Sequence, residues 1–528
     1  NKGEFPDPYQ LIFINPAVCE GCGDCGKKSN CVAVLPLDTE LGRKRAIDQS
    51  ACNKDFSCTE GFCPSFVTVH GAKVKKSKGV GADASVARLI AGLPEPKQPA
   101  LDGPYSMIVT GVGGTGVVTI SAVLGQAAHI ENKGFGAIDM TGLAQKGGAV
   151  ACHMRVARSA DEIHAIRVGV ANADLIMGGD LVVSTYEMAT GDFTRNANLV
   201  VPGQALRTAI ADRVGRGSLA MLDAHEAAVK LFGDSIASNM FLLGFACQKG
   251  HVPIGTAAIE EAIELNGAAV AMNLQAFRFG RLAAHEPAAI ERLIRPADVV
   301  ALRPRTLDDT IKFRADHLMA YQDAALAERY RSKVAWIAGI ERDKAPGRNG
   351  LADAVARGYH KLLAIKDEYE VARLYTDGTF EKALAAQFDG VTSVEFHLAP
   401  PFLAWFHKDK LTGQPRKIKL GAWMLPVFRQ LAKGKRLRGT MFDLFGLSAE
   451  RRLERQMIVD YERVLDEIGQ RLSVATHGTT VALASLPDEI KGFGHVKKAN
   501  YEAAKKREAG LLAMLRDPKP APVRVAAE

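Results

Sequence analysis

The chain has 528 residues, a length typical of two to four domains. Its hydrophobic fraction of 47% is that of a globular protein with buried cores, and its net charge of +8 is modest for the length. Nucleic-acid binding would need a concentrated basic face with aromatic residues, so we expect no nucleic acid as a partner. The sequence holds no uncharged apolar run of about 18 residues, so we expect no membrane-spanning helix.

We expect no export signal at the amino-terminal end of this sequence. The first residue is Asn1 and no signal peptide follows it, so we expect a processed product or a piece of a longer protein. Without an export signal, cysteines at short spacing favour a metal or iron–sulfur site in the reducing cytoplasm over a disulfide framework.

Seven of the nine cysteines lie within residues 19–63, which predict a small ferredoxin-like iron–sulfur domain over residues 1–70. Three of the seven follow one another at two-residue spacing, and the glycines between them let the backbone wrap closely around a cluster. In ferredoxins the fourth ligand is a cysteine followed by proline, as in Cys63-Pro64. We therefore predict one [4Fe-4S] cluster with these ligands: Cys19, Cys22, Cys25 and Cys63.

Three further cysteines remain, which are Cys31, Cys52 and Cys58. The exchange of ligands found in two-cluster ferredoxins would give Cys31 to a second cluster with the other two, and one ligand is then missing. Three possibilities stay open: a three-iron cluster, a non-cysteine ligand such as Asp55, or no second cluster. A zinc ribbon is the alternative for the whole segment, although two separate C-x2-C pairs would be more typical of zinc.

Residues 71–104 are rich in lysine and proline and predict a linker. Residues 105–295 then alternate strand-like and helix-like runs, which indicates a Rossmann-like α/β domain with a parallel sheet. The clearest elements are strands at 105–110 and 173–178 and helices at 121–130 and 259–263.

A glycine-rich turn, G111-V-G-G-T-G116, follows the first of these strands and opens a helix. It satisfies the G-x-G-x-x-G pattern, which presents free backbone amides to an anion at the helix N-terminus. A second glycine-rich loop, T141-G-L-A-Q-K-G-G-A-V150, carries a lysine. The candidate cofactor-binding residues are Gly111, Gly113, Gly114, Thr115, Gly116 and Lys146.

Two other interpretations of this turn stay open. Asp139 lies where an acid that binds the ribose of a dinucleotide would sit, which favours NAD or FAD. The glycines would otherwise serve only the close packing of helix on strand. Gly114 and Thr115 depart from the usual FAD pattern, and two glycine-rich loops suit a phosphate-bearing or subunit-facing edge better than a dinucleotide fold alone.

Residues 296–528 predict a mostly helical domain. Apolar residues recur near helical spacing over 306–330, with Thr306 as an N-cap, and again over 351–387 and 448–471.

The order of these motifs resembles a known family. The glycine-rich part, followed by N239-M-F-L-L-G244 and M272-N-L-Q-A-F-R-F-G280, resembles the gamma domain of thiamine-dependent 2-oxoacid:ferredoxin oxidoreductases. The cysteine segment that runs into V67-T-V-H-G71, together with the helical end, resembles the fused, single-chain indolepyruvate ferredoxin oxidoreductases.

The resemblance implies a reaction and a set of partners. In that family thiamine diphosphate, bound with Mg²⁺, attacks the keto carbon of an aryl-2-oxoacid, CO₂ leaves, and electrons pass singly to iron–sulfur clusters. The acyl group goes to coenzyme A. This chain would be the electron-transfer and gamma portion, inactive alone, with thiamine-binding domains before residue 1, ferredoxin as electron acceptor and a homodimeric assembly. Gly113 to Gly116 would be the contacts to coenzyme A.

Two other classes of function remain as alternatives. The first is an iron–sulfur flavoprotein or NAD(P)-linked electron-transfer module, with Asp139 binding the ribose. The second is a non-catalytic subunit that only holds its partner domains together.

Overall fold

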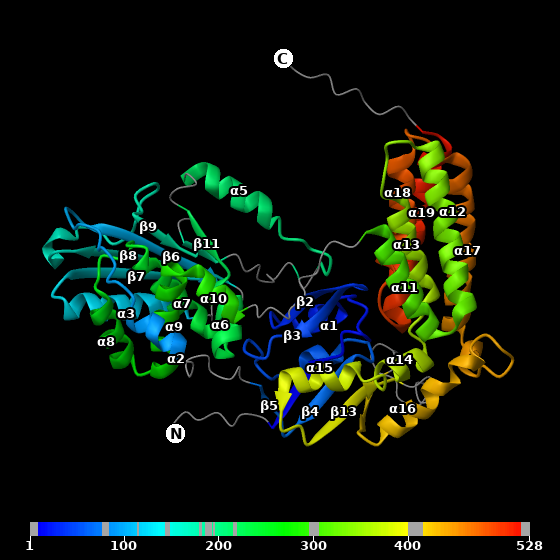
Figure 1. Ribbon diagram of the computed structural model, residues 1–528, viewed down its shortest axis with the longest axis horizontal. Coiled ribbons are helices and arrows are strands. Elements are labelled where there is room, and N and C mark those ends of the chain that lie inside the picture. The colour runs from blue at the N-terminus through cyan, green and yellow to red at the C-terminus, as the bar shows by residue number, and fades with distance from the viewer. Residues whose placement is uncertain are drawn as a thin grey trace, which may run out of the picture.

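The computed structural model describes residues 9–75, 84–112, 116–142, 148–178, 182–184, 193, 196–214, 219–294, 306–399 and 416–518. They form an α/β domain, a central body that contains the clustered cysteines, and a helical bundle. Figure 1 shows the central body between the other two. Within the described ranges, none of the helices has the length and apolar composition needed to cross a membrane.

The α/β domain is built on a six-stranded sheet in the order β11-β10-β9-β6-β8-β7. Strand β6 pairs in parallel with β9, and β10 pairs in parallel with both β9 and β11. Strand β8 is antiparallel to both of its neighbours. The strands are β6 Tyr105–Val112, β7 Gly134–Thr141, β8 Ala149–Ala157, β9 Leu175–Met177, β10 Val182–Ser184 and β11 Ala220–Leu222.

The prediction of a parallel sheet is therefore wrong for β8. Only residues 142–148 connect β7 to β8, and a parallel pairing would need a crossover of about a dozen residues or more. The short connection forces the antiparallel arrangement, and β8 then separates β7 from β6.

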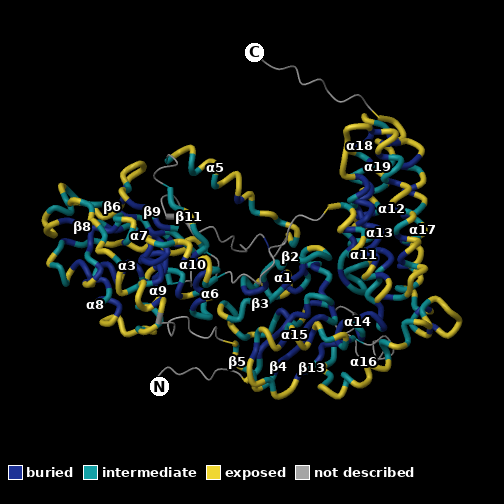
Figure 2. The backbone as a smooth tube through the Cα atoms, viewed as in Figure 1, coloured by how far each residue is buried: buried dark blue, intermediate teal, exposed yellow. Residues whose placement is uncertain are grey.

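Helices pack on the faces of this sheet around one large apolar core, which appears dark blue in Figure 2. The predicted strands at 105–110 and 173–178 and the predicted helices at 121–130 and 259–263 are confirmed. The helices around this core are α2 Ala84–Ala91, α3 Val117–Ile130, α6 Ala224–Phe232, α7 Ser238–Gln248, α8 Thr256–Asn266, α9 Val270–His285 and α10 Pro287–Ile294. Helix α5 Gly203–Val214 also belongs to this part of the chain but contributes no residue to the core.

The central body contains a four-stranded sheet in the order β1-β4-β13-β14, with every pair antiparallel. Its strands are β1 Gln10–Ile14, β4 Phe66–His70, β13 Ser393–Leu398 and β14 Ile418–Gly421. A hairpin and a short strand pair complete the body: β2 Val34–Thr39 with β3 Gly42–Ile47, and β5 Lys73–Val74 with β12 Phe388–Asp389. Its helices are α1 Asp24–Ser29, α14 Glu368–Leu374, α15 Thr379–Gln387 and α16 Met424–Lys433.

This sheet joins parts of the chain that the sequence placed in different domains. Two strands come from residues 10–70 and two from residues 393–421, and their apolar side chains share one core. The segment predicted as a linker also contributes β5 to the body and α2 to the α/β domain. The apolar face of a short sheet must be buried against other elements, and here those elements come from parts of the chain that are far apart in the sequence.

The helical bundle confirms the predicted helical character of the carboxy-terminal region. Thr306 is the N-cap of α11, where it forms a capping box with Asp309. The bundle packs around its own core of apolar and tyrosine side chains. Its helices are α11 Leu307–Tyr321, α12 Ala324–Lys344, α13 Leu351–Leu363, α17 Ala449–Arg471, α18 His477–Ser485 and α19 Gly494–Arg516.

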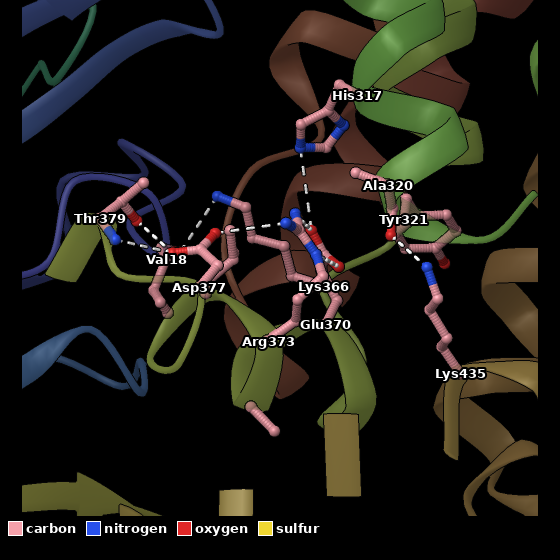
Figure 3. Close-up of polar contacts among 12 residues, drawn as sticks. Val18, His317, Ala320, Tyr321, Lys366, Glu370, Arg373, Asp377, Thr379 and Lys435 are labelled. Atoms are coloured by element: carbon pink, nitrogen blue, oxygen red, sulfur yellow. Dashed lines mark hydrogen bonds and ion pairs between the residues drawn. The ribbon is translucent and has the colours of Figure 1, made fainter. Parts of the chain in front are cut away.

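Polar contacts join the bundle to the central body (Figure 3). His317 of α11 lies 3.8 Å from the carboxylate of Glu370 on α14, and Arg373 of the same helix donates to Glu370 at 2.6 Å. Lys435, in the turn after α16, donates to the carbonyl oxygen of Ala320 at 2.7 Å. Polar contacts to α11 therefore join the two units in addition to the chain.

We predict that helices α7 and α9 tolerate no side chain where they cross. A Cβ atom on Gly244 would lie 1.9 Å from the carbonyl oxygen of Phe277, and one on Gly280 would lie 1.9 Å from that of Phe241. Gly244→Ala should lower the free energy of unfolding by at least about 2 kcal/mol because the helices must separate. Gly339→Ala in α12, with no atom nearer than 3.9 Å, should instead stabilise by about 0.5–1 kcal/mol. Urea unfolding of both variants checks the pair, and equal effects would contradict the packing.

A buried histidine in the central sheet predicts acid sensitivity. His397 Nε2 lies 2.8 Å from Thr68 Oγ1 between β13 and β4, and burial, with Lys417 and Lys419 nearby, lowers the pKa of His397 to about 3. The unfolded chain takes up this proton near the ordinary histidine pKa of 6.5, so stability falls as the pH falls below about 6.5. At pH 5 the loss from this group should be about 2 kcal/mol. His397→Gln should flatten the pH dependence of urea unfolding; an unchanged slope would exclude this histidine as a cause.

Candidate metal centre

Two of the predicted ligands, Cys19 and Cys22, lie on the loop between β1 and α1, and Cys25 lies in the first turn of α1. Gly21 and Gly23 within this loop have φ values of 68° and 78°, a region that favours glycine. A Cβ atom on Gly21 would lie 2.0 Å from the carbonyl oxygen of Arg43 in β3. The glycine at 21 is therefore required for the cysteine loop to pack against the hairpin. Gly26, which lies within α1, has no such backbone conformation.

The fourth predicted ligand comes to the same place through the turn before β4. Gly61 packs directly on Cys25, and the backbone amide of Phe62 donates to Asp24 Oδ2 at 2.7 Å. As a result, Cys19, Cys22, Cys25 and Cys63 all line one small cavity, together with Arg45 and Phe66. The structure thus brings together the four cysteines that the sequence assigned to one cluster, while their role as ligands stays a prediction.

Backbone amides are directed at the sulfur atoms of this site. The amide of Gly21 donates to Cys19 Sγ at 3.3 Å. Cys22 and Cys63 each accept a hydrogen bond from the amide two residues further on, and Ser65 Oγ lies 3.0 Å from Cys63 Sγ. Hydrogen bonds of this kind stabilise negative charge on sulfur and are one of the features that tune iron–sulfur sites.

Three thiols of this cavity, those of Cys22, Cys25 and Cys63, resist ionisation in the absence of a cation. Burial raises the pKa of Cys22 to about 12, with Cys63 and Cys19 adding to the effect. Burial likewise raises the pKa of Cys25 and of Cys63. A group of buried thiols becomes thiolate when positive charge is supplied, and bound metal supplies it.

The other three cysteines form a second group. Cys31 and Cys52 pack against the same apolar cluster that contains Cys58. Burial raises the pKa of Cys58 to about 12, with Cys52 and Cys31 adding to the effect. Cys52 accepts a hydrogen bond from the amide of Lys54, which lies two residues further on, as the amide donors do in the first group. Asp55 belongs to a local turn: its carboxylate accepts hydrogen bonds from Asn53 Nδ2 and from the amide and hydroxyl of Ser57.

The arrangement of donors argues against a single zinc ion. In the part of the chain that the structure describes, no three His, Cys, Asp or Glu side chains converge closely enough to hold one metal ion. A zinc ion needs four ligands at about 2.0–2.3 Å around one point. A four-iron cluster instead takes each thiolate at a different corner of a cube, so a wider set of cysteines around a cavity fits it.

Only part of the predicted glycine-rich site lies within the described residues. Gly111 is in β6, where a Cβ atom would lie 2.5 Å from Val117 Cγ2, and Gly116 is the N-cap of α3 with φ of 88°. These two glycines therefore allow the close approach of strand and helix that the motif predicts. Gly113, Gly114, Thr115 and Lys146 lie outside the described residues.

The order of the strands argues against the interpretation of the glycine turn as a dinucleotide-binding site. In a dinucleotide-binding fold the ribose-binding acid ends the strand beside the first one. Here β8 lies between β6 and β7, so Asp139 of β7 is two strands away from the glycine turn. Its carboxylate Oδ1 accepts a hydrogen bond from Ser121 Oγ at 3.2 Å.

Residues that the sequence did not single out hold the cysteine loop in place. Lys366, just before α14, donates to the carbonyl oxygens of Val18 and Cys19 at 3.1 and 3.0 Å and pairs with Glu20 Oε1 at 2.8 Å (Figure 3). Burial raises the pKa of Glu20, but Lys366 and neighbouring lysines outweigh burial and hold it well below its usual range. No spacing in the sequence relates Lys366 to the cysteines, because the contact is created by the fold alone.

We predict that Lys366→Met destabilises the central body by about 3 kcal/mol, because it leaves the carboxylate of Glu20 buried without its partner. Both side chains are nearly buried, at 12% and 11% exposure. Arg463→Met is the matched control: Arg463 is 74% exposed and pairs with Asp460 at 3.5 Å, so its loss should cost less than about 0.5 kcal/mol. Urea unfolding measures both, and similar losses would mean that the Lys366 contact is no stronger than a surface pair.

Comparisons with known proteins cover two parts of the chain. A family model described as pyruvate ferredoxin/flavodoxin oxidoreductase matches residues 106–283, and a model of a family of unknown function matches residues 307–510. The indolepyruvate oxidoreductase subunit IorB of Methanothermobacter thermautotrophicus is 25% identical over 200 residues, which are 34% of this chain and 98% of the relative. The same subunit of Pyrococcus horikoshii is 28% identical over 199 residues, 34% of this chain and 96% of the relative.

Two solved structures align with the same share of the chain. The pyruvate oxidoreductase subunit PORC of Thermotoga maritima has 21% identity and a TM-score of 0.24, over 34% of this chain and 96% of its own. The gamma subunit of a keto/oxoacid ferredoxin oxidoreductase from Geobacter sulfurreducens has 19% identity and a TM-score of 0.23, over 34% and 98%. The family match at 106–283 and the two IorB relatives show that the middle of the chain is similar to gamma-type subunits of 2-oxoacid:ferredoxin oxidoreductases, and they support a fusion of such a domain with the cysteine-rich segment and the helical region.

Proposed function

We propose that this chain is the electron-transfer and gamma portion of an enzyme that oxidatively decarboxylates an aryl-2-oxoacid. The observation that carries the proposal is the meeting of four cysteines around one cavity, in a chain that also holds a gamma-type domain. The ferredoxin-like residues 1–70 would hold a [4Fe-4S] cluster on Cys19, Cys22, Cys25 and Cys63. That cluster supplies one-electron transfer between the site of oxidation and ferredoxin.

The substrate and the other cofactors are part of the same proposal. Two relatives of the gamma-type domain are named indolepyruvate oxidoreductase subunits, which supports an indolepyruvate-like acid as substrate. Thiamine diphosphate and Mg²⁺ would bind in other domains of the enzyme, and coenzyme A would accept the acyl group. The glycine turn, with Gly113 to Gly116 and Lys146, would face coenzyme A or the partner domains. We propose a cytoplasmic homodimer that docks ferredoxin.

The residues of this chain have defined tasks in the proposal. The four thiolates would ligate the cluster, and the amide of Gly21 together with Ser65 Oγ would stabilise the charge on sulfur. Burial of the cavity would keep water from the cluster, and Lys366 holds the cysteine loop against the segment that precedes α14. The second group of cysteines, which are Cys31, Cys52 and Cys58, would hold a second cluster only with a further ligand.

We predict that Cys22→Ser removes about four irons per chain with their sulfides, because it takes away one corner of the first cluster. The measurement is iron and acid-labile sulfide content, with electron paramagnetic resonance of the reduced protein. Cys247→Ser is the control, since Cys247 lies buried in α7 of the α/β domain and should leave the iron content unchanged.

Three outcomes of this experiment are informative. About four irons in the unaltered chain would mean one cluster, and about eight would mean that the second group of cysteines is also occupied. Zinc without iron and sulfide in the purified chain would contradict the proposal. Full electron transfer to ferredoxin by the Cys22→Ser enzyme, assembled with its thiamine-binding domains, would favour a purely structural role for this chain.

A further inference from the structure

The side chain of Lys417 reaches from the carboxy-terminal half of the chain to both groups of cysteines. Its ammonium group donates to the carbonyl oxygen of Gly61 and lies 3.5 Å from that of Cys63. It also lies 4.7 Å from the centre of the Phe66 ring, which lines the same cavity as the four cysteines. Lys417 directly precedes β14, the edge strand of the central sheet.

The charge of Lys417 acts on members of both groups. Burial lowers the pKa of Lys417, and this effect is opposed by Cys63 and Cys25 in the first group and by Cys58 in the second. Lys417 thus stands where one positive charge can influence both groups at once.

This charge has no carboxylate bound to it. Among the described residues Lys417 forms no ion pair, and its hydrogen bonds go to neutral carbonyl oxygens. Asp24 interacts with it more weakly than the three cysteines, and the carboxylate of Asp24 is already hydrogen-bonded to the amide of Phe62. An ammonium group in a largely buried position without an acid is costly unless negative charge lies nearby. A cluster with thiolate ligands would supply that charge, and more of it after reduction.

We propose that Lys417 raises the reduction potential of the cluster held by Cys63, because its charge stabilises the added electron. The inference rests on the proposed iron–sulfur function and assigns the control of potential to a residue outside the cysteine segment. Charge and hydrogen bonding near a cluster are among the factors that set its potential. The presence of Cys58 nearby extends the same effect, more weakly, to a cluster on the second group.

The test is a redox titration of the intact, iron-loaded chain, followed by electron paramagnetic resonance. Lys417→Met should lower the equilibrium constant for reduction about tenfold, which for a one-electron couple is about 59 mV. Lys417→Gln, which keeps a donor for the carbonyl of Gly61 but loses the charge, should show the same shift. Lys417→Arg keeps the charge and should retain most of the original potential.

Lys419→Met is the matched control. Lys419 is an exposed lysine of β14, two residues away. The Lys419→Met substitution removes the same net charge as Lys417→Met, and it should leave the reduction potential of the cluster unchanged. Iron and sulfide are measured for every variant, so that potentials are compared only between fully loaded proteins.

The outcomes separate this inference from the proposed function. An unaltered chain without iron and sulfide would overturn the proposed function itself. Loaded Lys417→Met and Lys417→Gln proteins with the original potential would overturn the inference alone. The inference would also be overturned if the reduction potential of the Lys417→Arg protein shifted as far as that of the neutral variants, because hydrogen-bond geometry would then matter more than charge. If both neutral variants fail to load iron, Lys417 belongs to the framework of the site, and its role in setting the potential is overturned.

Discussion

The cysteine segment cannot bury its own apolar side chains from water, and the structure of the rest of the central body follows from this constraint. A segment of about 60 residues with short strands buries too little apolar surface for a stable core of its own. Residues from the second half of the chain provide the missing cover, through β13 and β14 on the sheet edge and through α14 on its face. Tyr375 donates to the carbonyl oxygen of Pro64 at 2.6 Å, and Asn15 donates to that of Leu374 at 3.2 Å. Both ends of the cysteine-bearing segment are therefore held by residues from the distant half of the chain.

Residues from the second half of the chain also contribute to the electrostatics of the site. Cysteine thiols buried in one cavity need nearby positive charge to become ligands, and the segment itself supplies Lys44 and Arg45 from β3. The distant half of the chain adds Lys366 and Lys417, which bind backbone carbonyls beside the cysteines. Fusion of the helical region to the cysteine segment in one chain thus has a physical role: it fixes the loop and supplies charge to it.

The α/β domain shows how one short connection changes a fold. Its glycine turn, first strand and first helix match the pattern of a dinucleotide-binding unit, and Gly116 begins α3 as the motif predicts. The insertion of β8 beside β6 then moves Asp139 away from the turn. The local motif is shared with nucleotide-binding proteins, but the pairing of strands is not.

The sequence by itself determined what depends on neighbours along the chain. Spacing and a following proline singled out Cys19, Cys22, Cys25 and Cys63, and periodicity located the strand at 105–110 and the capped helix that begins after Thr306. Hydrogen bonds of helices and turns are local, so such patterns carry them. Only the tertiary structure decided that β8 is antiparallel, that β13 and β14 complete the cysteine-bearing sheet, and that Lys366 and Lys417 lie beside the cysteines. These features depend on pairing between distant strands and on burial of a shared core, and no spacing along the chain records either.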